Sequence, residues 1–297
     1  MGMKIYSLLV GTILAITMFV VPVHASSTDN TLAKLGQGST KVDYVSEAKE
    51  AVERYINASK QQDPGEMAKW AIDTRFRSTE EQINEYSSIL RDNPFSSTEL
   101  SSIIDNGNNT LTANITLTRN DNGEKNNVSI PVINLDGDWK LYITGVETMS
   151  SDVKRDINKL NKFHAKNNVV TPFNQEPGSH AYVNFSLMKP NCNFIYCNKT
   201  AYSSTFDMDF STVYIVGVQY SRSDEVTYQI VKYGIISDDV YGANTFRGKY
   251  TSDVPFEGWI STVTRRDNVK LKVVNVSSDT GASGYVNVYN LPYNGQG

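Results

Sequence analysis

The chain is poor in the residue types that most often perform enzyme chemistry. Its 297 residues include 3 His and 2 Cys, and His24 lies within the first 25 residues, after the apolar N-terminal run. A hydrolase triad needs a general base beside its nucleophile. Neither His164 nor His180 is accompanied by a Gly-x-Ser-x-Gly sequence. The sequence therefore argues against a triad hydrolase and against a metal site built on histidines.

A clustered run of basic residues is also missing. The chain has 28 basic and 32 acidic residues, with acid in excess over residues 41–149 (11 basic, 18 acidic) and near balance over residues 150–297 (15 and 13). A nucleic-acid-binding protein would show Lys and Arg gathered on one face. We therefore expect no nucleic-acid partner.

Only one stretch is apolar enough for membrane targeting. Lys4 precedes the apolar run Ile5–Val21, and small residues ending at Ala25 form a cleavage signature. These features predict a signal peptide of Gram-positive type over residues 1–25, cleaved before Ser26, and therefore a secreted bacterial protein without a membrane span. About 17 apolar residues are just enough to cross a bilayer, so an uncleaved N-terminal anchor is the alternative.

The two cysteines, Cys192 and Cys197, are separated by four residues. Outside the cell, two cysteines this close usually pair. We expect a disulfide that holds a local turn and contributes about 2 kcal/mol on the chain-entropy argument. Two thiols without a matching His or Cys pair do not make a zinc site.

The length and the residue patterns predict two folded domains. We expect a flexible leader over residues 26–41 and an α+β domain over residues 42–149. A helical connector and linker follow over residues 150–178, and an all-β domain occupies residues 179–297.

Three helices are expected at the start of the α+β domain. Asp43–Lys60 carries apolar residues at spacings of three and four, which is typical of an amphipathic helix. Asp63 and Ser78 each begin a capping sequence, with Glu66 and Glu81 three residues later, and so predict the starts of two further helices.

From Ser97 the apolar period changes to two, which predicts strands. In Thr110–Thr118 the alternation predicts one face packed on the helices and one face toward water. Asp121-Asn122-Gly123 and Asp136-Gly137-Asp138 are turn signals. The expected strands are Leu100–Ile104, Thr110–Thr118, Asn127–Asn134 and Trp139–Ile143.

This order of three helices and an antiparallel meander, ending in Gly137-Asp138-Trp139-Lys140, resembles the NTF2-like (cystatin-like cone) superfamily over Val42–Thr144. The resemblance implies a curved sheet that wraps the helices and encloses a cavity. It also implies Asp73 and Tyr55 as groups facing that cavity. Burial beside Trp70 would raise the pKa of Asp73 and make it a usable catalytic base, whereas the alternative is an exposed Asp near a helix end.

The last 119 residues are rich in Val, Ile, Tyr and Thr, with Ser, Asp, Asn and Gly between the apolar runs. This spacing predicts a β-sandwich of Ig-like or jelly-roll topology. The fold class is therefore α+β followed by all-β. The expected strands are Tyr182–Leu187, Thr212–Tyr220, Thr227–Ile236, Trp259–Thr264, Val269–Val276 and Tyr285–Tyr289.

Aromatic residues are dense in the expected β-sandwich. On a β surface they stack on sugars or anchor a protein partner, and in a core they simply fill space. Trp259 and Tyr250 are the candidate ligand-binding residues.

Two pairs of carboxylates in the β-rich part are possible oxygen ligands. Asp207 and Asp209 are two residues apart and would share one side of an extended segment, as Ca²⁺ sites in extracellular β domains require. The adjacent Asp238 and Asp239 offer further oxygens. The alternative is a solvated strand edge or turn, and no cofactor is expected.

These observations favour a secreted, non-enzymatic binding protein. Its β domain would recognise an extracellular protein or glycan, and its α+β domain would act as a scaffold or small-ligand pocket. One alternative is an enzyme of the isomerase, dehydratase or hydrolase type that uses the NTF2-like cavity. Another is a structural component of a cell-surface or spore-coat assembly.

Overall fold

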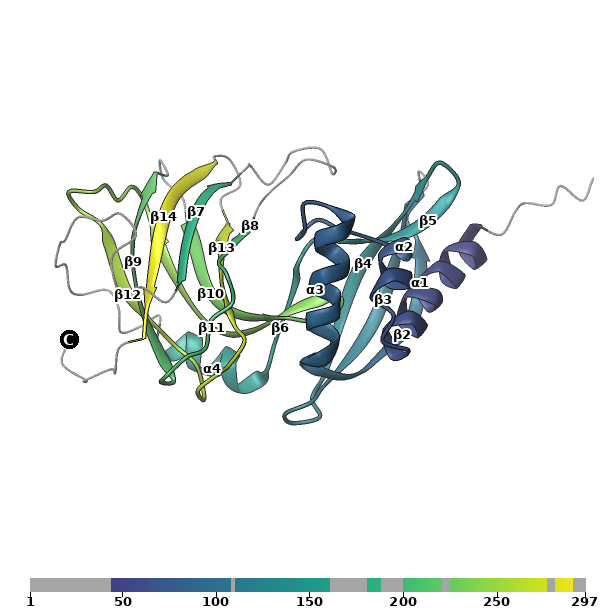
Figure 1. Ribbon diagram of the computed structural model, residues 1–297, viewed down its shortest axis with the longest axis horizontal. Coiled ribbons are helices and arrows are strands. Elements are labelled where there is room, and N and C mark those ends of the chain that lie inside the picture. The colour runs from purple at the N-terminus through teal and green to yellow at the C-terminus, as the bar shows by residue number, and fades with distance from the viewer. Residues whose placement is uncertain are drawn as a thin grey trace, which may run out of the picture. The chain divides into compact units, whose positions relative to one another are not determined.

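A computed structural model describes residues 44–107, 110–160, 181–187, 200–220, 225–276 and 281–290. All of these residues belong to one compact unit. The order of the elements along the chain is helices with a mostly antiparallel sheet, then two further sheets (Figure 1). Within the described ranges, no helix combines the length and the apolar character needed to cross a membrane. The expected signal peptide, the leader, His164, His180, Cys192 and Cys197 lie outside the described residues.

Three helices open the described chain: α1 (Tyr44–Lys60), α2 (Pro64–Trp70) and α3 (Thr79–Arg91). The predicted caps are confirmed, because Asp63 Oδ1 accepts a hydrogen bond from Glu66 N at 2.9 Å and Ser78 Oγ accepts one from Glu81 N at 3.1 Å. Each cap satisfies a backbone N–H that has no partner within its helix.

The first sheet has the strand order β1-β5-β4-β3-β2. β1 pairs with β5 in parallel and the other neighbours are antiparallel. Asp136 (φ 54°) and Gly137 (φ 100°) form the two-residue turn between β4 and β5, where both positions need positive φ. The strands are β1 (Ala71–Asp73), β2 (Phe95–Asp105), β3 (Thr110–Arg119), β4 (Lys125–Leu135) and β5 (Asp138–Ile143).

The helices bury one face of this sheet. In β3 the alternate residues are fully buried and their neighbours are not, as the period of two predicts. They share a core with Val52 and Tyr55 of α1. Two irregularities in the pairing of β2 with β3 are the kind of feature that bends a sheet. The buried residues of β3 are Leu111, Ala113, Ile115 and Leu117.

Two further sheets follow, with the orders β6-β11-β10-β13-β8 and β12-β9-β14-β7. The second sheet comprises β6 (Val146–Met149), β8 (Thr200–Tyr202), β10 (Glu225–Tyr233), β11 (Ser237–Arg247) and β13 (Lys270–Asn275). The third comprises β7 (Ala181–Leu187), β9 (Thr212–Tyr220), β12 (Phe256–Ser261) and β14 (Ala282–Tyr289). Helix α4 (Ser151–Leu160) follows β6.

The second and third sheets share one apolar core, with Ile230 and Leu271 from one sheet and Ile215 and Val286 from the other. The chain is therefore a mixed α+β protein with a β-rich C-terminal part. Strand β6 pairs with β11 in parallel, although it precedes the expected start of the β domain by some 30 residues. Strand β11 was not predicted from the sequence. It carries two completely buried carboxylates, Asp238 and Asp239.

Candidate functional site

A row of aromatic side chains crosses three neighbouring strands of the third sheet. In β9, Val213 and Ile215 point into the core, so Tyr214 between them lies on the opposite face. The pairing register places Trp259 of β12 and Tyr289 of β14 directly beside Tyr214. We call Trp259, Tyr214 and Tyr289 the aromatic row.

The rings of the aromatic row contact one another. The centroids of Trp259 and Tyr214 are 5.0 Å apart, and those of Tyr214 and Tyr289 are 6.4 Å apart. All three residues are partly exposed. Such neighbours hold each other in place and present their remaining surface as a preformed apolar strip with polar edges.

An acid flanks the aromatic row. The Tyr214 hydroxyl donates a hydrogen bond to Glu257, which precedes Trp259 by two residues on the same face of β12. Burial and this carboxylate both raise the pKa of Tyr214, so the hydroxyl stays protonated at neutral pH. The row therefore combines ring faces with a hydroxyl and a carboxylate.

A buried amide lies on the same face. Asn287 of β14 pairs with Val216 of β9 and with Tyr182 of β7, and its side chain is completely buried. Neither its Nδ2 nor its Oδ1 has a hydrogen-bond partner among the described residues. Buried amides are normally paired, and an unpaired one costs about 1–3 kcal/mol. This position thus holds an unused donor and an unused acceptor beside the aromatic row.

The two predicted ligand-binding residues are in different surroundings. Trp259 belongs to the aromatic row. Tyr250 contacts Phe246 and Phe256, with ring centroids at 6.1 and 5.8 Å, at the border of the shared core. Burial raises the pKa of Tyr250. The structure therefore does not bring Trp259 and Tyr250 into one aromatic row.

The predicted base, Asp73, is buried on β1 and is held by an arginine. Arg75 Nε donates to Asp73 Oδ1 at 2.9 Å, and its Nη2 donates to Oδ2 at 2.6 Å. Tyr86 also donates its hydroxyl to Oδ2 at 3.1 Å. The other residue implied to face a cavity, Tyr55, is fully buried and donates to the Ile235 carbonyl. Both groups are thus engaged with their neighbours.

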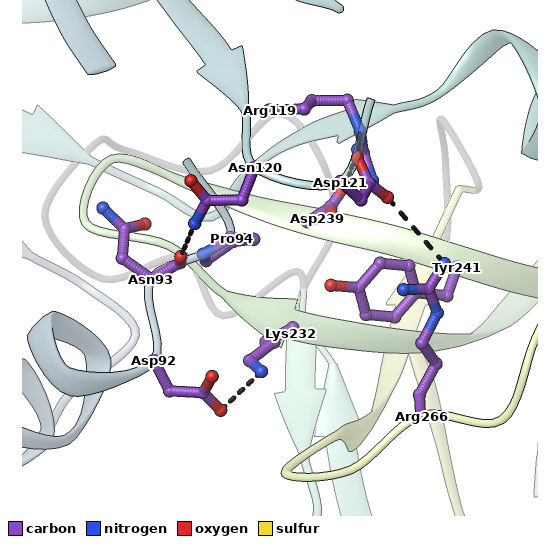
Figure 2. Close-up of a pocket in the computed structure, with 10 residues that line it drawn as sticks. All are labelled: Asp92, Asn93, Pro94, Arg119, Asn120, Asp121, Lys232, Asp239, Tyr241 and Arg266. Carbon is purple, nitrogen blue, oxygen red and sulfur yellow. Dashed lines mark hydrogen bonds and ion pairs between the residues drawn. The ribbon is translucent and has the colours of Figure 1, made fainter. Parts of the chain in front are cut away.

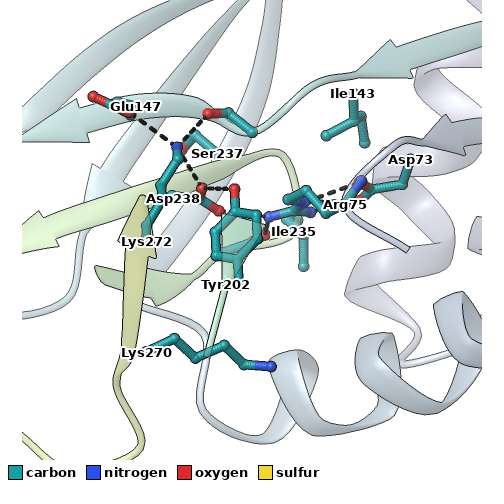
Figure 3. Close-up of polar contacts among 12 residues, drawn as sticks. Asp73, Arg75, Ile143, Glu147, Tyr202, Ile235, Ser237, Asp238, Lys270 and Lys272 are labelled. Atoms are coloured by element: carbon teal, nitrogen blue, oxygen red, sulfur yellow. Dashed lines mark hydrogen bonds and ion pairs between the residues drawn. The ribbon is translucent and has the colours of Figure 1, made fainter. Parts of the chain in front are cut away.

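Arg75 continues this contact into a buried ionic network with the second sheet (Figure 3). Its Nη1 donates to Asp238 Oδ1 at 2.9 Å, and Lys272 Nζ donates to Asp238 Oδ2 at 2.8 Å. Tyr202 donates to the same oxygen at 2.6 Å, and Lys272 also pairs with Glu147 at 3.0 Å. The side chains of Arg75, Asp238 and Lys272 are completely buried.

The ionic network lowers the pKa of its central carboxylate, Asp238. Burial by itself raises the pKa of Asp238, but Lys272 and Arg75 outweigh it and hold that pKa below its usual range. Asp238 is therefore ionised at neutral pH. We conclude that the network anchors β11, β13 and the first sheet to each other, because each of its charges has an opposite partner.

The backbone conformation and the close packing beside this network require glycine at position 145. Its φ is +72°, its carbonyl accepts a hydrogen bond from Lys272 at 2.8 Å, and an added Cβ would lie 2.6 Å from the Tyr202 hydroxyl. Gly145→Ala should lower the free energy of unfolding by about 3 kcal/mol, from positive φ and steric conflict together. The matched control is Gly123→Ala, whose φ is +70° with nothing within 4 Å. Equal losses in chemical denaturation for the two variants would refute the steric contribution.

The predicted calcium ligands lie just before β9. Asp207 and Asp209 are exposed, and Asp207 Oδ1 accepts a hydrogen bond from Asn268 N at 2.8 Å. Within the described part of the chain, no three His, Cys, Asp or Glu side chains gather closely enough to hold a metal ion. Asp207 therefore acts here as a local anchor for the backbone at Asn268.

Sequence reasoning missed Glu257 and Asn287 of the aromatic face, and Arg75 and Lys272 of the ionic network. A signal for the aromatic row was present in the alternation around Tyr214, which separates core from surface positions. The network had no comparable signal, because its members are scattered between Asp73 and Lys272.

No family model and no curated protein matches this chain. Among solved structures, a de novo designed protein with a curved β-sheet has 14% identity and a TM-score of 0.27, and the match covers 39% of this chain and 94% of that one. A glycoside hydrolase family 43 arabinoxylan arabinofuranohydrolase from Bacillus subtilis, in complex with cellotetraose, has 9% identity and a TM-score of 0.23. That match covers 65% of this chain and 40% of the hydrolase chain. Likenesses this low assign neither a family nor a function to the chain.

Proposed function

We propose that this chain is a secreted binding protein that recognises an extracellular glycan through the aromatic row of its β-rich part. The observation that carries the proposal is the alignment of Trp259, Tyr214 and Tyr289 across three strands, with ring centroids 5.0 and 6.4 Å apart. Partly exposed ring faces of this kind stack on sugar rings and exclude water from the contact.

The polar groups around the row favour a glycan over a protein surface. Glu257 and the hydroxyl of Tyr214 lie beside the ring faces. The amide of Asn287 is completely buried and is not part of this contact surface. Sugar hydroxyls both donate and accept hydrogen bonds, so they complement such a mixture. An extracellular protein partner remains the other outcome of the experiment.

We also propose that the chain combines an NTF2-like domain with a β-sandwich. The packing of α1, α2 and α3 on one face of a bulged antiparallel sheet supports an NTF2-like scaffold over residues 42–149. The core shared by the second and third sheets supports a β-sandwich. The sequence of residues 1–25 supports export.

The alternative, an enzyme that uses Asp73 as its catalytic base, has less support. Both oxygens of Asp73 accept hydrogen bonds from Arg75, and one also accepts a hydrogen bond from Tyr86. A general base needs a free lone pair within reach of the substrate proton. We therefore propose that the α+β part acts as a scaffold.

The experiment is retention of the protein, expressed from Ser26 onward, by insoluble cell-wall polysaccharide and by a glycan array. Trp259→Ala should weaken binding roughly 10–30-fold, because a central aromatic anchor is typically worth about 2 kcal/mol. Phe210→Ala removes an exposed aromatic residue outside the row and should leave binding unchanged. Near-UV circular dichroism would verify that both variants are folded.

Undiminished glycan binding by folded Trp259→Ala would contradict the proposal. Retention of a protein from the cell-wall fraction, with no polysaccharide or array signal, would replace the glycan by a protein partner. Absence of both kinds of binding would remove the aromatic row as a recognition surface.

A further inference from the structure

A polar pocket, distinct from the aromatic row, has a volume of about 220 Å³. Figure 2 shows residues of the first sheet, the second sheet and the segment before β13 converging on it. Its lining includes three cations and three carboxylates, so the side-chain charges sum to zero. They are Arg119, Lys232, Arg266, Asp92, Asp121 and Asp239.

The pocket contains a carboxylate with an unused oxygen. The side chain of Asp239 is completely buried, and its Oδ1 accepts a hydrogen bond from Arg119. Its Oδ2 has no partner among the described residues. The neighbouring Tyr241 hydroxyl favours the ionised form but does not complete a hydrogen bond to Oδ2. Burial raises the pKa of Asp239, which is the effect expected when a carboxylate lacks a full set of donors.

The pocket also contains a guanidinium with an unused donor. The Cζ of Arg266 lies 4.1 Å from the centroid of the Tyr241 ring, and its Nη2 lies 3.9 Å from Asp121 Oδ2. Its Nε is buried and has no acceptor within the described part of the chain. The pocket thus combines an unsatisfied anionic acceptor with an unsatisfied cationic donor.

We propose that this pocket binds a small α-amino acid in its zwitterionic form. The ammonium group would donate to Asp239 Oδ2, and the carboxylate would accept from the Arg266 guanidinium. Both contacts are charge-assisted and therefore about twice as strong as neutral hydrogen bonds. A ligand of zero net charge also leaves the balanced lining neutral, whereas a simple anion or cation does not.

The size and rim of the pocket fit such a ligand. A volume of about 220 Å³ has room for several waters and therefore for an α-amino acid with a short side chain. Arg266 and Lys232 lie at the rim, with side chains 22% and 17% exposed. The 3.9 Å contact between Arg266 Nη2 and Asp121 Oδ2 is longer than a hydrogen bond.

The test is calorimetric titration of the protein, expressed from Ser26 onward, with glycine, L-alanine, L-serine and L-glutamine. We expect saturable binding of at least one free amino acid. N-acetylation, which removes the ammonium group, and amidation of the carboxylate should each weaken it at least tenfold. This inference does not depend on the aromatic row, so Trp259→Ala should bind amino acids normally.

Substitutions in the pocket and next to it should affect amino-acid binding differently. Arg266→Gln and Asp239→Asn should each weaken binding at least tenfold. The neighbouring Arg265→Gln, which loses only an exposed ion pair with Asp267, should bind normally. If Asp239→Asn does not fold, Arg266→Gln decides the question. No saturable binding up to about 10 mM, equal binding of N-acetylated ligands, or normal binding by Arg266→Gln would each overturn the inference.

Discussion

Replacing Arg75 by methionine is expected to lower the free energy of unfolding by about 3–5 kcal/mol, the usual cost of removing one partner from a buried ion pair. Arg75 is completely buried and joins Asp73 to Asp238, so its loss leaves Asp73 without a cation in an apolar surrounding. It also removes the donor to the Gly234 carbonyl at 3.0 Å. For a chain of this size, the midpoint of thermal unfolding should fall by roughly 10 °C.

The matched control is Arg155→Met. Arg155 also pairs with an aspartate, Asp152, but both side chains are more than half exposed. An exposed ion pair contributes only about 0–1 kcal/mol. Adding Asp73→Asn to Arg75→Met should recover part of the loss, because a neutral amide is less costly to bury than a carboxylate. Comparable urea midpoints for Arg75→Met and Arg155→Met would show that the network does not stabilise the fold.

The second large effect is expected for Lys272→Met, at about 2–4 kcal/mol near neutral pH. Lys272 is completely buried and donates both to Asp238 at 2.8 Å and to the Gly145 carbonyl at 2.8 Å. Methionine keeps the length and the apolar stem but removes the charge. Asp238 would retain Arg75 and Tyr202, so we expect a smaller loss than for Arg75→Met.

This loss should depend on pH. Lys272 and Arg75 hold the pKa of Asp238 below its usual range, so the folded state binds this proton less readily than the unfolded chain. The stabilisation is therefore complete above the unfolded pKa of about 3.9 and is lost as the pH falls through the lower folded value. The difference between wild type and Lys272→Met should shrink as the pH falls from about 6 to about 3.

Urea unfolding at these two pH values measures the effect. The control is Lys49→Met, because Lys49 pairs with Glu53 at 3.7 Å on the exposed face of α1. It should change the free energy of unfolding by less than about 1 kcal/mol at either pH. A Lys272→Met loss that is equally large at both pH values would contradict the assigned linkage to Asp238.

Local structure was largely predictable from the sequence, because its causes are local. Asp63 and Ser78 cap α2 and α3 through backbone groups three residues away. The turn at Asp136-Gly137 follows from the positive φ that both positions must adopt. The alternation in Thr110–Thr118 predicted which side chains of β3 the helices bury.

The candidate sites were only partly predictable. Trp259 was identified by residue type, but its neighbours Tyr214 and Tyr289 come from strands that are about 45 residues before it and 30 residues after it. The pairing register that aligns them results from how the whole sheet assembles. For Asp73 the sequence left a buried base and an exposed carboxylate as alternatives, and its partner Arg75 was not identified. Arg75 lies in the turn after β1, and a separation of two residues does not by itself indicate a contact.

The sequence by itself determined the helix starts, the hairpin turns, the division into helical and β-rich parts and the two faces of the strand at Thr110–Thr118. Only the tertiary structure shows that β11 is a buried strand. In the sequence, its adjacent Asp238 and Asp239 suggest a solvated turn. They are completely buried because Arg75, Arg119 and Lys272 reach them from other strands and loops. Burying an unpaired carboxylate costs several kcal/mol. Whether a segment such as β11 can enter a core therefore depends on cations that local sequence does not show.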